Sequence, residues 1–232
     1  MNAQLSHPTA ARNPRPRWNA RARCNARARP GRMRYARRVS RSSLVPGLLL
    51  AAPRLGDPNF ERSVVLLGRH SADGSLGWVL NGRALAPVKD LLRDSGLVPG
   101  DVTLPAGGAF DRIARKGGPV APATGWLLYV RGDTELPGEM NVGSSLGVTG
   151  DLNALQTVMR GGQPADFRLL LGYAGWGPGQ LENEVASGAW LPVSVSDSLV
   201  LDTESERLWD QAYFQSAGVT PIAFTSTRRG QA

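Results

Sequence analysis

FRLLLGYAGWGPGQLENEVASGAW, residues 167–190, is the stretch of this 232-residue chain that most directly predicts the fold. Its first part, 167–173, is a continuous apolar run typical of a buried strand. The glycines that follow predict a turn into a short helix over 178–187, and a second strand begins at Trp190. A strand that leads through glycines into a helix brings free backbone N–H groups to one point, so we look first here for a binding site.

Short apolar segments continue the pattern on both sides of this stretch. Strands are expected over 48–52, 63–69, 76–80, 102–104, 125–131, 142–149, 191–195 and 198–201. Helices are expected from Pro87 to Gly96, over 151–160, and after a capping box at 203–206. Because most of the strands are joined by short turns and only three or four helices intervene, the sequence predicts an α+β fold with a mixed, largely antiparallel sheet.

The charge is divided sharply along the chain. Residues 1–41 hold 12 of the 27 Lys and Arg and no acidic residue, so the other 15 Lys and Arg are outnumbered by 19 Asp and Glu. The net charge of +8 therefore belongs to the N-terminal segment, and the rest of the chain carries −4. We predict a disordered Arg-rich tail over 1–43, a single domain over 44–222 and a frayed end over 223–232. Nucleic acid could be bound only through the tail, or the tail is a solvated extension.

Cysteine and histidine are scarce. The single cysteine, Cys24, and one of the two histidines, His7, lie in the tail, so His70 is the only histidine of the predicted domain. This composition excludes a disulfide framework and disfavours the common zinc sites, and we predict no metal and no cofactor. No apolar run approaches the roughly 18 residues that a membrane span needs. We expect a cytoplasmic protein without membrane contact.

Two catalytic patterns are incomplete. The glycines of GYAGWGPGQ miss the dinucleotide fingerprint at Gln180, and no P-loop lysine follows them. Residues 143–147, GSSLG, match the G-x-S-x-G nucleophile pattern but lack a helix directly after the serine. His70 lies where a strand ends, and is either a hydrogen-bonded structural residue or a general base that faces a cleft.

Five segments occur in an order that resembles one family. They are DPNF at 57–60, SVVLL at 63–67 followed by His70, GWVLN at 77–81, GGPV at 117–120, and GYAGWGPGQLENE at 172–184 closed by Trp190. Together they resemble the AlgH/YqgE family of bacterial proteins over about 44–219. Two features depart from the family pattern: Gly82-Arg83 follows Asn81 where a basic residue and proline are usual, and 97–116 is longer.

The resemblance implies an AlgH-like α+β domain whose mixed sheet partly closes into a barrel flanked by helices. Family members are often labelled transcriptional regulators, which favours a regulatory or adaptor protein that binds a protein or a small molecule. We predict that the motif loops converge on a site, because polar residues at strand ends and turns are typical of binding sites. The residues expected to line it are Asp57, Asn59, His70, Asn81, Gly118, Trp176 and Gln180.

Two other functions are compatible with the sequence. The first is a metal-free, hydrolase-like enzyme that uses His70 as general base and the amides of 175–179 as an oxyanion site. The second is a nucleic-acid binder that acts through residues 1–41.

Overall fold

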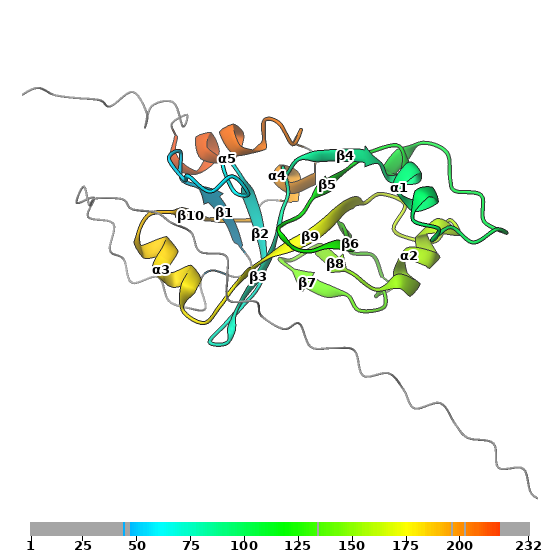
Figure 1. Ribbon diagram of the computed structural model, residues 1–232, viewed down its shortest axis with the longest axis horizontal. Coiled ribbons are helices and arrows are strands. Elements are labelled where there is room, and N and C mark those ends of the chain that lie inside the picture. The colour runs from blue at the N-terminus through cyan, green and yellow to red at the C-terminus, as the bar shows by residue number, and fades with distance from the viewer. Residues whose placement is uncertain (1–43, 45–46, 134, 196, 202, 219–232) are drawn as a thin grey trace, which may run out of the picture.

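A single mixed sheet organises the part of the chain that the computed structural model describes, which is residue 44 and residues 47–133, 135–195, 197–201 and 203–218 (Figure 1). Five α-helices and one 3-10 helix pack around its ten strands. The predicted tail, 1–43, and the frayed end, 223–232, lie outside the described residues. The bounds of the domain at 44 and 222 stay a prediction.

The elements follow one another with short connections. The strands are β1 (Gly47–Ala51), β2 (Val64–Ser71), β3 (Gly74–Val79), β4 (Ala84–Pro87), β5 (Ile113–Lys116), β6 (Val120–Val130), β7 (Met140–Val142), β8 (Leu146–Thr149), β9 (Arg168–Trp176) and β10 (Trp190–Ser194). The helices are α1 (Val88–Asp94), η2 (Gly108–Phe110), α2 (Leu152–Met159), α3 (Gln180–Ala186), α4 (Asp197–Leu201) and α5 (Leu208–Ala217).

The sheet is largely antiparallel, as predicted. Its strand order is β10-β1-β2-β3-β9-β6-β8-β7, and β4 and β5 form a side branch in which β5 pairs in parallel with β9. The sheet curls so that β7 approaches β2 and a half-barrel results. The predicted α+β fold with a partly closed barrel is confirmed.

Three apolar clusters hold the layers together. The inner face of the half-barrel packs against α4 and α5, the strands around β9 and β6 pack on their other face against α1 and α2, and β1 to β3 pack against α3. Figure 1 shows α5 and α3 on opposite sides of β1 and β2. Each fully buried Leu or Val side chain contributes about 1.5–3 kcal/mol to folding. Helix α5 is fixed further by Trp209 and Tyr213, which both donate to the Ala51 carbonyl, at 2.9 and 3.0 Å.

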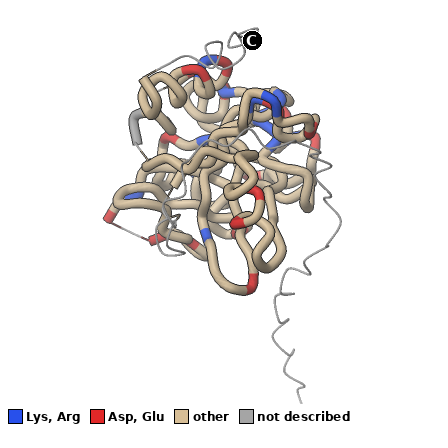
Figure 2. The backbone as a smooth tube through the Cα atoms, turned by 90° about the vertical axis from the view of Figure 1, so that its left-hand side faces the viewer, with Lys and Arg blue, Asp and Glu red and all other residues tan. Residues whose placement is uncertain are grey.

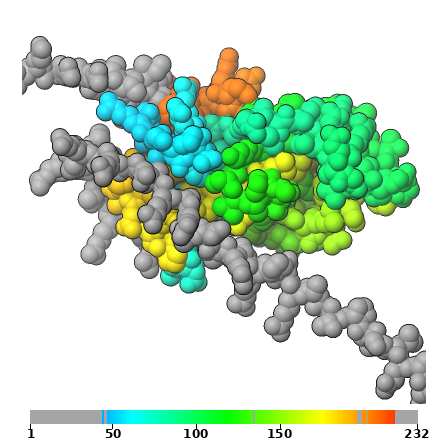
Figure 3. Space-filling view, viewed as in Figure 1, coloured from blue at the N-terminus to red at the C-terminus, as the bar shows by residue number. Residues whose placement is uncertain are grey.

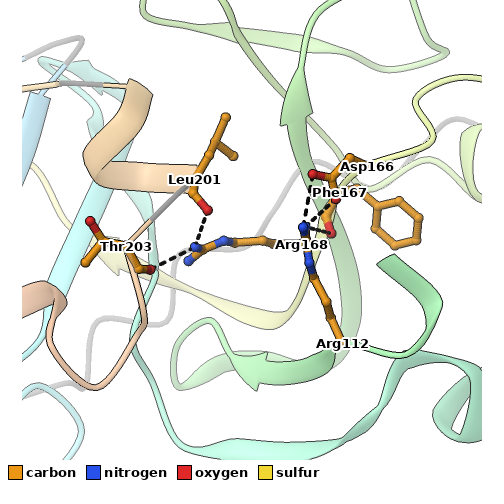
Figure 4. A network of polar contacts seen from close by, with 6 residues as sticks. All are labelled: Arg112, Asp166, Phe167, Arg168, Leu201 and Thr203. Atoms are coloured by element: carbon orange, nitrogen blue, oxygen red, sulfur yellow. Dashed lines mark hydrogen bonds and ion pairs between the residues drawn. The ribbon is translucent and has the colours of Figure 1, made fainter. Parts of the chain in front are cut away.

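Two arginines anchor the beginning of β9 in different directions (Figure 4). Arg112 donates to the Phe167 carbonyl at 3.3 Å and pairs with the Asp166 carboxylate. Arg168 donates to the carbonyls of Leu201, the last residue of α4, and of Thr203, at 2.7 and 3.0 Å. A cation at carbonyls that follow a helix is favourable, so Arg168 ties the central strand to the covering helices.

The structure corrects several expected elements. Residues 198–201 belong to helix α4 and not to a strand, because a short apolar run fits either element and tertiary packing decides. Residues 102–104 form no strand, and the single strand expected over 142–149 is the β7–β8 hairpin. The capping box at 203–206 is wrong: α5 begins at Leu208 with no side-chain cap.

Candidate functional site

The 57–60 loop is a rigid polar turn. The Asp57 carboxylate accepts the backbone N–H of Asn59 at 2.8 Å, which is the geometry of an Asx turn. The exposed Asn59 carboxamide oxygen in turn accepts Lys116 Nζ at 3.1 Å. Two motif loops that are 57 residues apart in the chain therefore meet at this contact.

Asn81 holds the loop before β2 through two side-chain hydrogen bonds. Its Oδ1 accepts the Val64 N–H at 2.8 Å, and its Nδ2 donates to the Arg62 carbonyl at 2.9 Å. Arg62 has a φ of 53°, an uncommon value for a residue with a side chain. The bond from Asn81 and the contact of the Arg62 guanidinium with the Trp209 ring, at 4.7 Å, hold this conformation.

Gly117 and Gly118 pack directly against the backbone of the sheet. Gly117 accepts the Val79 N–H through its carbonyl and donates its own N–H to the Leu171 carbonyl, at 2.8 and 2.6 Å. A Cβ atom on Gly118 would lie 2.1 Å from the Tyr173 carbonyl carbon, so only glycine fits there. Figure 3 shows the cyan segment before residue 62 against the bright green segment that follows residue 115. We call residues 57–62, 81–83 and 115–118 the loop surface.

Trp176 and Gln180 belong to a second group, in which Trp176 is buried and Gln180 is half-buried. The Trp176 ring is 3% exposed and packs against Phe60 and Trp190, with ring centroids 6.3 and 6.0 Å away. Phe60 and Trp190 also pack edge to face at 5.6 Å. Trp176 was expected to line the site, but its neighbours cover its ring. Phe60 connects this aromatic group to the loop surface.

Glu184 organises the polar side of that group. Its Oε2 accepts the indole N–H groups of both Trp176 and Trp190, at 2.9 and 2.8 Å. Its Oε1 accepts Gln180 Nε2 at 2.8 Å, and the Gln180 carboxamide oxygen accepts the Gly177 N–H at 3.1 Å. The backbone N–H of Gly177, which could have bound an anion, therefore donates to the Gln180 side chain.

His70 lies apart from the loop surface and is sealed. Its side chain is 1% exposed, Nδ1 lies 2.7 Å from Ser75 Oγ, and Nε2 lies 3.9 Å from Glu182 Oε1. The ring thus faces a hydroxyl group on one side and a carboxylate on the other. The structure thus joins the loops that carry Asp57, Asn59, Asn81 and Gly118, and it places Trp176 against Phe60 of the first of them. Gln180 lies on α3 and is bonded to Glu184, and His70 lies between the β2–β3 hairpin and α3.

Charge at the loop surface is only partly neutralised. Arg62 pairs with Asp210 and Arg115 with Glu206, and the hydrogen bond from Arg115 holds the pKa of the Glu206 carboxyl below its usual range. Lys116 is hydrogen-bonded to a neutral carboxamide. In Figure 2, basic and acidic positions are interspersed over the described backbone.

Among the described residues, no three His, Cys, Asp or Glu side chains come close enough to hold a metal ion. No helix in that part of the chain combines the length and the apolar character needed to cross a membrane.

Three residues of the site were missed from the sequence. Lys116 is one of only two lysines in the chain, but nothing in its position predicts the contact with Asn59. Glu184 follows Gln180 by four residues, a spacing that places both side chains on one helix face and could have revealed the pair. The contact of Phe60 with Trp176 depends on the tertiary fold.

The fold and these loops define a class of small α+β proteins in which a curled, largely antiparallel sheet carries polar loops at its strand ends. The sequence profile of the AlgH-like family matches residues 48–221, and the chain belongs to this family. UPF0301 proteins from Myxococcus xanthus and from Anaeromyxobacter dehalogenans are 41% and 39% identical to the chain; the alignments cover 80% and 79% of the chain and 97% and 92% of these relatives.

Two solved structures resemble the fold of this chain. The solution structure of the AlgH protein from Pseudomonas aeruginosa is 28% identical, with a TM-score of 0.62 over 83% of this chain and 98% of that one. A crystal structure of a protein from Corynebacterium diphtheriae, at 21% identity, matches the fold with a TM-score of 0.62 over 80% of this chain and 92% of that one. The resemblance to the AlgH/YqgE family is confirmed.

Proposed function

We propose that this chain is a cytoplasmic regulatory or adaptor protein that binds another protein through the loop surface. The observation that carries the proposal is the contact between Asn59 and Lys116, which joins two motif loops at an exposed position. Loops are where binding residues concentrate when a rigid scaffold positions them.

Preorganisation supports a binding role. Asp57 fixes the turn that carries Asn59, Asn81 fixes the loop before β2, and Phe60 anchors the same loop in the Trp176 cluster. A surface whose side chains are already ordered loses less conformational entropy when a partner binds. The hydrogen bonds described above would thus maintain a contact surface.

The chemistry of the surface favours a partner with carboxylates. Lys116 carries a positive charge and is held by the neutral Asn59, whereas the neighbouring Arg62 and Arg115 are already paired with acidic residues. An Asp or Glu of a partner could accept from Lys116, and the Asn59 carboxamide could bond backbone groups beside it.

The geometry argues against the enzymatic alternative that the sequence allows. A general base must reach its substrate, and His70 is 1% exposed with Nδ1 at hydrogen-bonding distance from Ser75. The Gly177 amide, part of the expected oxyanion site, bonds Gln180. Nucleic-acid binding through residues 1–41 concerns residues outside the described part and stays a prediction; the acidic remainder of the chain is poorly suited to it.

The two lysines of the chain provide a matched test. Lys116→Glu reverses the charge at residue 116 of the loop surface, and Lys89→Glu makes the same change on α1, where Lys89 pairs with Asp111. The full chain and both variants are used as bait for proteins of the source cells, with quantification by mass spectrometry. We expect Lys116→Glu to lose at least about tenfold of a partner that Lys89→Glu retains. Equal recovery by all three baits would reject the loop surface as the binding site.

A further inference from the structure

The two strands of the side branch, β4 and β5, bring two cations of the loop surface together (Figure 1). Ala84 is opposite Arg115 in the antiparallel register of these strands. Arg83, one residue before, is therefore opposite Lys116, whose N–H donates to the Arg83 carbonyl at 3.0 Å. Side chains that are directly opposite each other in an antiparallel pair project from the same face, with Cβ atoms about 4.5–5.5 Å apart. Arg83 and Lys116 are thus neighbouring cations on one face.

Neither of these cations is neutralised by a carboxylate of the described chain. Arg83 is exposed and makes no ion pair with any residue that the structure describes. Lys116 is half-buried, and its Nζ is hydrogen-bonded to the neutral Asn59 carboxamide. Like charges that are directly opposite each other destabilise a pair of strands. An arrangement that lowers stability in this way is expected at functional sites, where a ligand of opposite charge relieves the repulsion.

Close backbone contacts fix the two segments that carry these cations. A Cβ atom on Gly82 would lie 1.9 Å from the Lys116 carbonyl oxygen, so only a glycine lets the two segments touch here. Arg115 strengthens the contact from the opposite face of the strand pair. Its guanidinium donates to the Gly82 carbonyl at 3.2 Å and pairs with Glu206. Because the backbone is already ordered, less conformational entropy is lost when an anion binds.

We propose that Arg83 and Lys116 together bind a phosphate group on a side chain of the partner protein. The inference rests on the proposed function and specifies the chemical group that a partner presents to the loop surface. A phosphorylated serine or threonine carries a charge of about −1.5 to −2 at pH 7, which matches two adjacent cations better than the single charge of a carboxylate. A guanidinium can bond two phosphate oxygens at once, and an ammonium adds a point charge.

The alternative is a pair of solvated surface cations whose repulsion is screened by salt. In that case any anion is attracted weakly, and Arg83 behaves like other exposed arginines. Arg69 of β2 offers the comparison, because it is also exposed and also makes no ion pair within the described part of the chain.

The test is an NMR titration of the ¹⁵N-labelled full chain with three peptides, acetyl-Gly-Gly-X-Gly-Gly-amide, in which X is phosphoserine, glutamate or serine. We expect the phosphoserine peptide to shift the backbone signals of Arg83 and Lys116 saturably, and to bind at least about fivefold more tightly than the glutamate peptide. The serine peptide should cause no saturable shift. Because the Arg-rich segment 1–41 also attracts anions, the affinity is taken only from the signals of these two residues.

Single variants separate the two cations from general charge effects. Arg83→Gln and Lys116→Gln should each weaken binding of the phosphoserine peptide at least about fivefold, and Arg69→Gln should leave it unchanged. The urea midpoint of Arg83→Gln should equal or exceed that of the wild type, since the substitution removes a repulsion. The proposal is overturned by the absence of a saturable shift, by equal affinities for the phosphoserine and glutamate peptides, or by equal effects of Arg83→Gln and Arg69→Gln.

A second measurement separates this proposal from the proposed function. The bait experiment with the wild-type chain and Lys116→Glu is repeated on cell extracts that have been treated with a protein phosphatase. We expect the wild-type chain to lose from treated extracts the partner that Lys116→Glu loses from untreated ones. A partner that depends on Lys116 but is recovered equally after phosphatase treatment would overturn the phosphate assignment and leave the proposed function standing.

Discussion

Glu184→Gln is the most informative single change, because the hydrogen bonds around residue 184 have a fixed direction. The chain of bonds begins at the Gly177 N–H, passes through Gln180 and Glu184, and ends at the N–H groups of Trp176 and Trp190. The backbone N–H at one end and the indole N–H groups at the other are all donors. One of the two side chains between them must therefore accept hydrogen bonds on both sides. A carboxylate meets this condition, and a second carboxamide does not.

The expected loss of stability follows from the loss of one hydrogen bond of residue 184. In Glu184→Gln, either the new NH₂ faces the two indole N–H groups or it faces the Gln180 NH₂, and two donors oppose each other in both cases. A hydrogen bond to a charged group contributes about 1.5–3 kcal/mol, and a partly buried donor left unpaired costs a similar amount. We expect the free energy of unfolding to fall by about 2 kcal/mol.

A second substitution should restore the pattern. In Gln180→Glu combined with Glu184→Gln, the carboxylate at 180 accepts both the Gly177 N–H and the new NH₂, and the carboxamide oxygen at 184 accepts both indoles. The double variant should regain at least about 1 kcal/mol relative to Glu184→Gln, which is a coupling energy typical of contacting residues.

These differences are measured by urea unfolding that is monitored by circular dichroism, and the m-values of the variants should equal that of the wild type. Glu61→Gln, at an exposed residue of the loop surface, is the matched control and should change stability by less than about 0.5 kcal/mol. A Glu184→Gln protein as stable as the wild type, or a double variant no more stable than Glu184→Gln, would refute the reasoning.

Two further stability predictions follow. Gly118→Ala should lower the free energy of unfolding in urea by about 3 kcal/mol, because the new Cβ atom would lie 2.1 Å from the Tyr173 backbone. Gly56→Ala is the control and should lower it by less than about 0.5 kcal/mol, because nothing lies within 4 Å of a Cβ atom there. Similar losses at both positions would count against the close approach at Gly118. Burial raises the pKa of Tyr213 to about 12 from 10.0, so its contribution to stability is complete below pH 10 and is lost as the pH rises toward 12. Tyr213→Phe should therefore lose less stability than the wild type between these pH values, and parallel pH profiles would show that Tyr213 does not titrate with unfolding.

Local patterns in the sequence predicted much of the fold. The apolar runs at β1, β2, β3 and β9 and the turns between them led to the antiparallel arrangement, because strand length and turn chemistry are local properties. Asp151 was expected near the beginning of a helix and caps α2 by accepting the Asn153 N–H at 2.7 Å. Strands β4 and β5 were not predicted, since they are short and β5 depends on its parallel pairing with β9.

The site was harder to predict than the fold. Asp57, Asn59, Asn81 and Gly118 were expected near one another, and all four belong to the loop surface. The sequence could not show that Phe60 covers Trp176, or that Glu182 approaches His70, because these contacts join elements far apart in the chain. Polar residues in a motif can hold loops in place as well as bind ligands, and a sequence does not separate the two roles.

Reactivity of the two lysines in the source cells tests the proposed function most directly. Intact cells and the purified full chain are treated with a cell-permeable, amine-selective acetylating reagent, and the modification of Lys116 and Lys89 is quantified by mass spectrometry. We expect Lys116 to be at least about threefold less reactive in cells than in the purified chain, because a bound partner covers it, and Lys89 to react equally in both. Equal reactivity of Lys116 in cells and in the purified chain would contradict a protein partner at the loop surface.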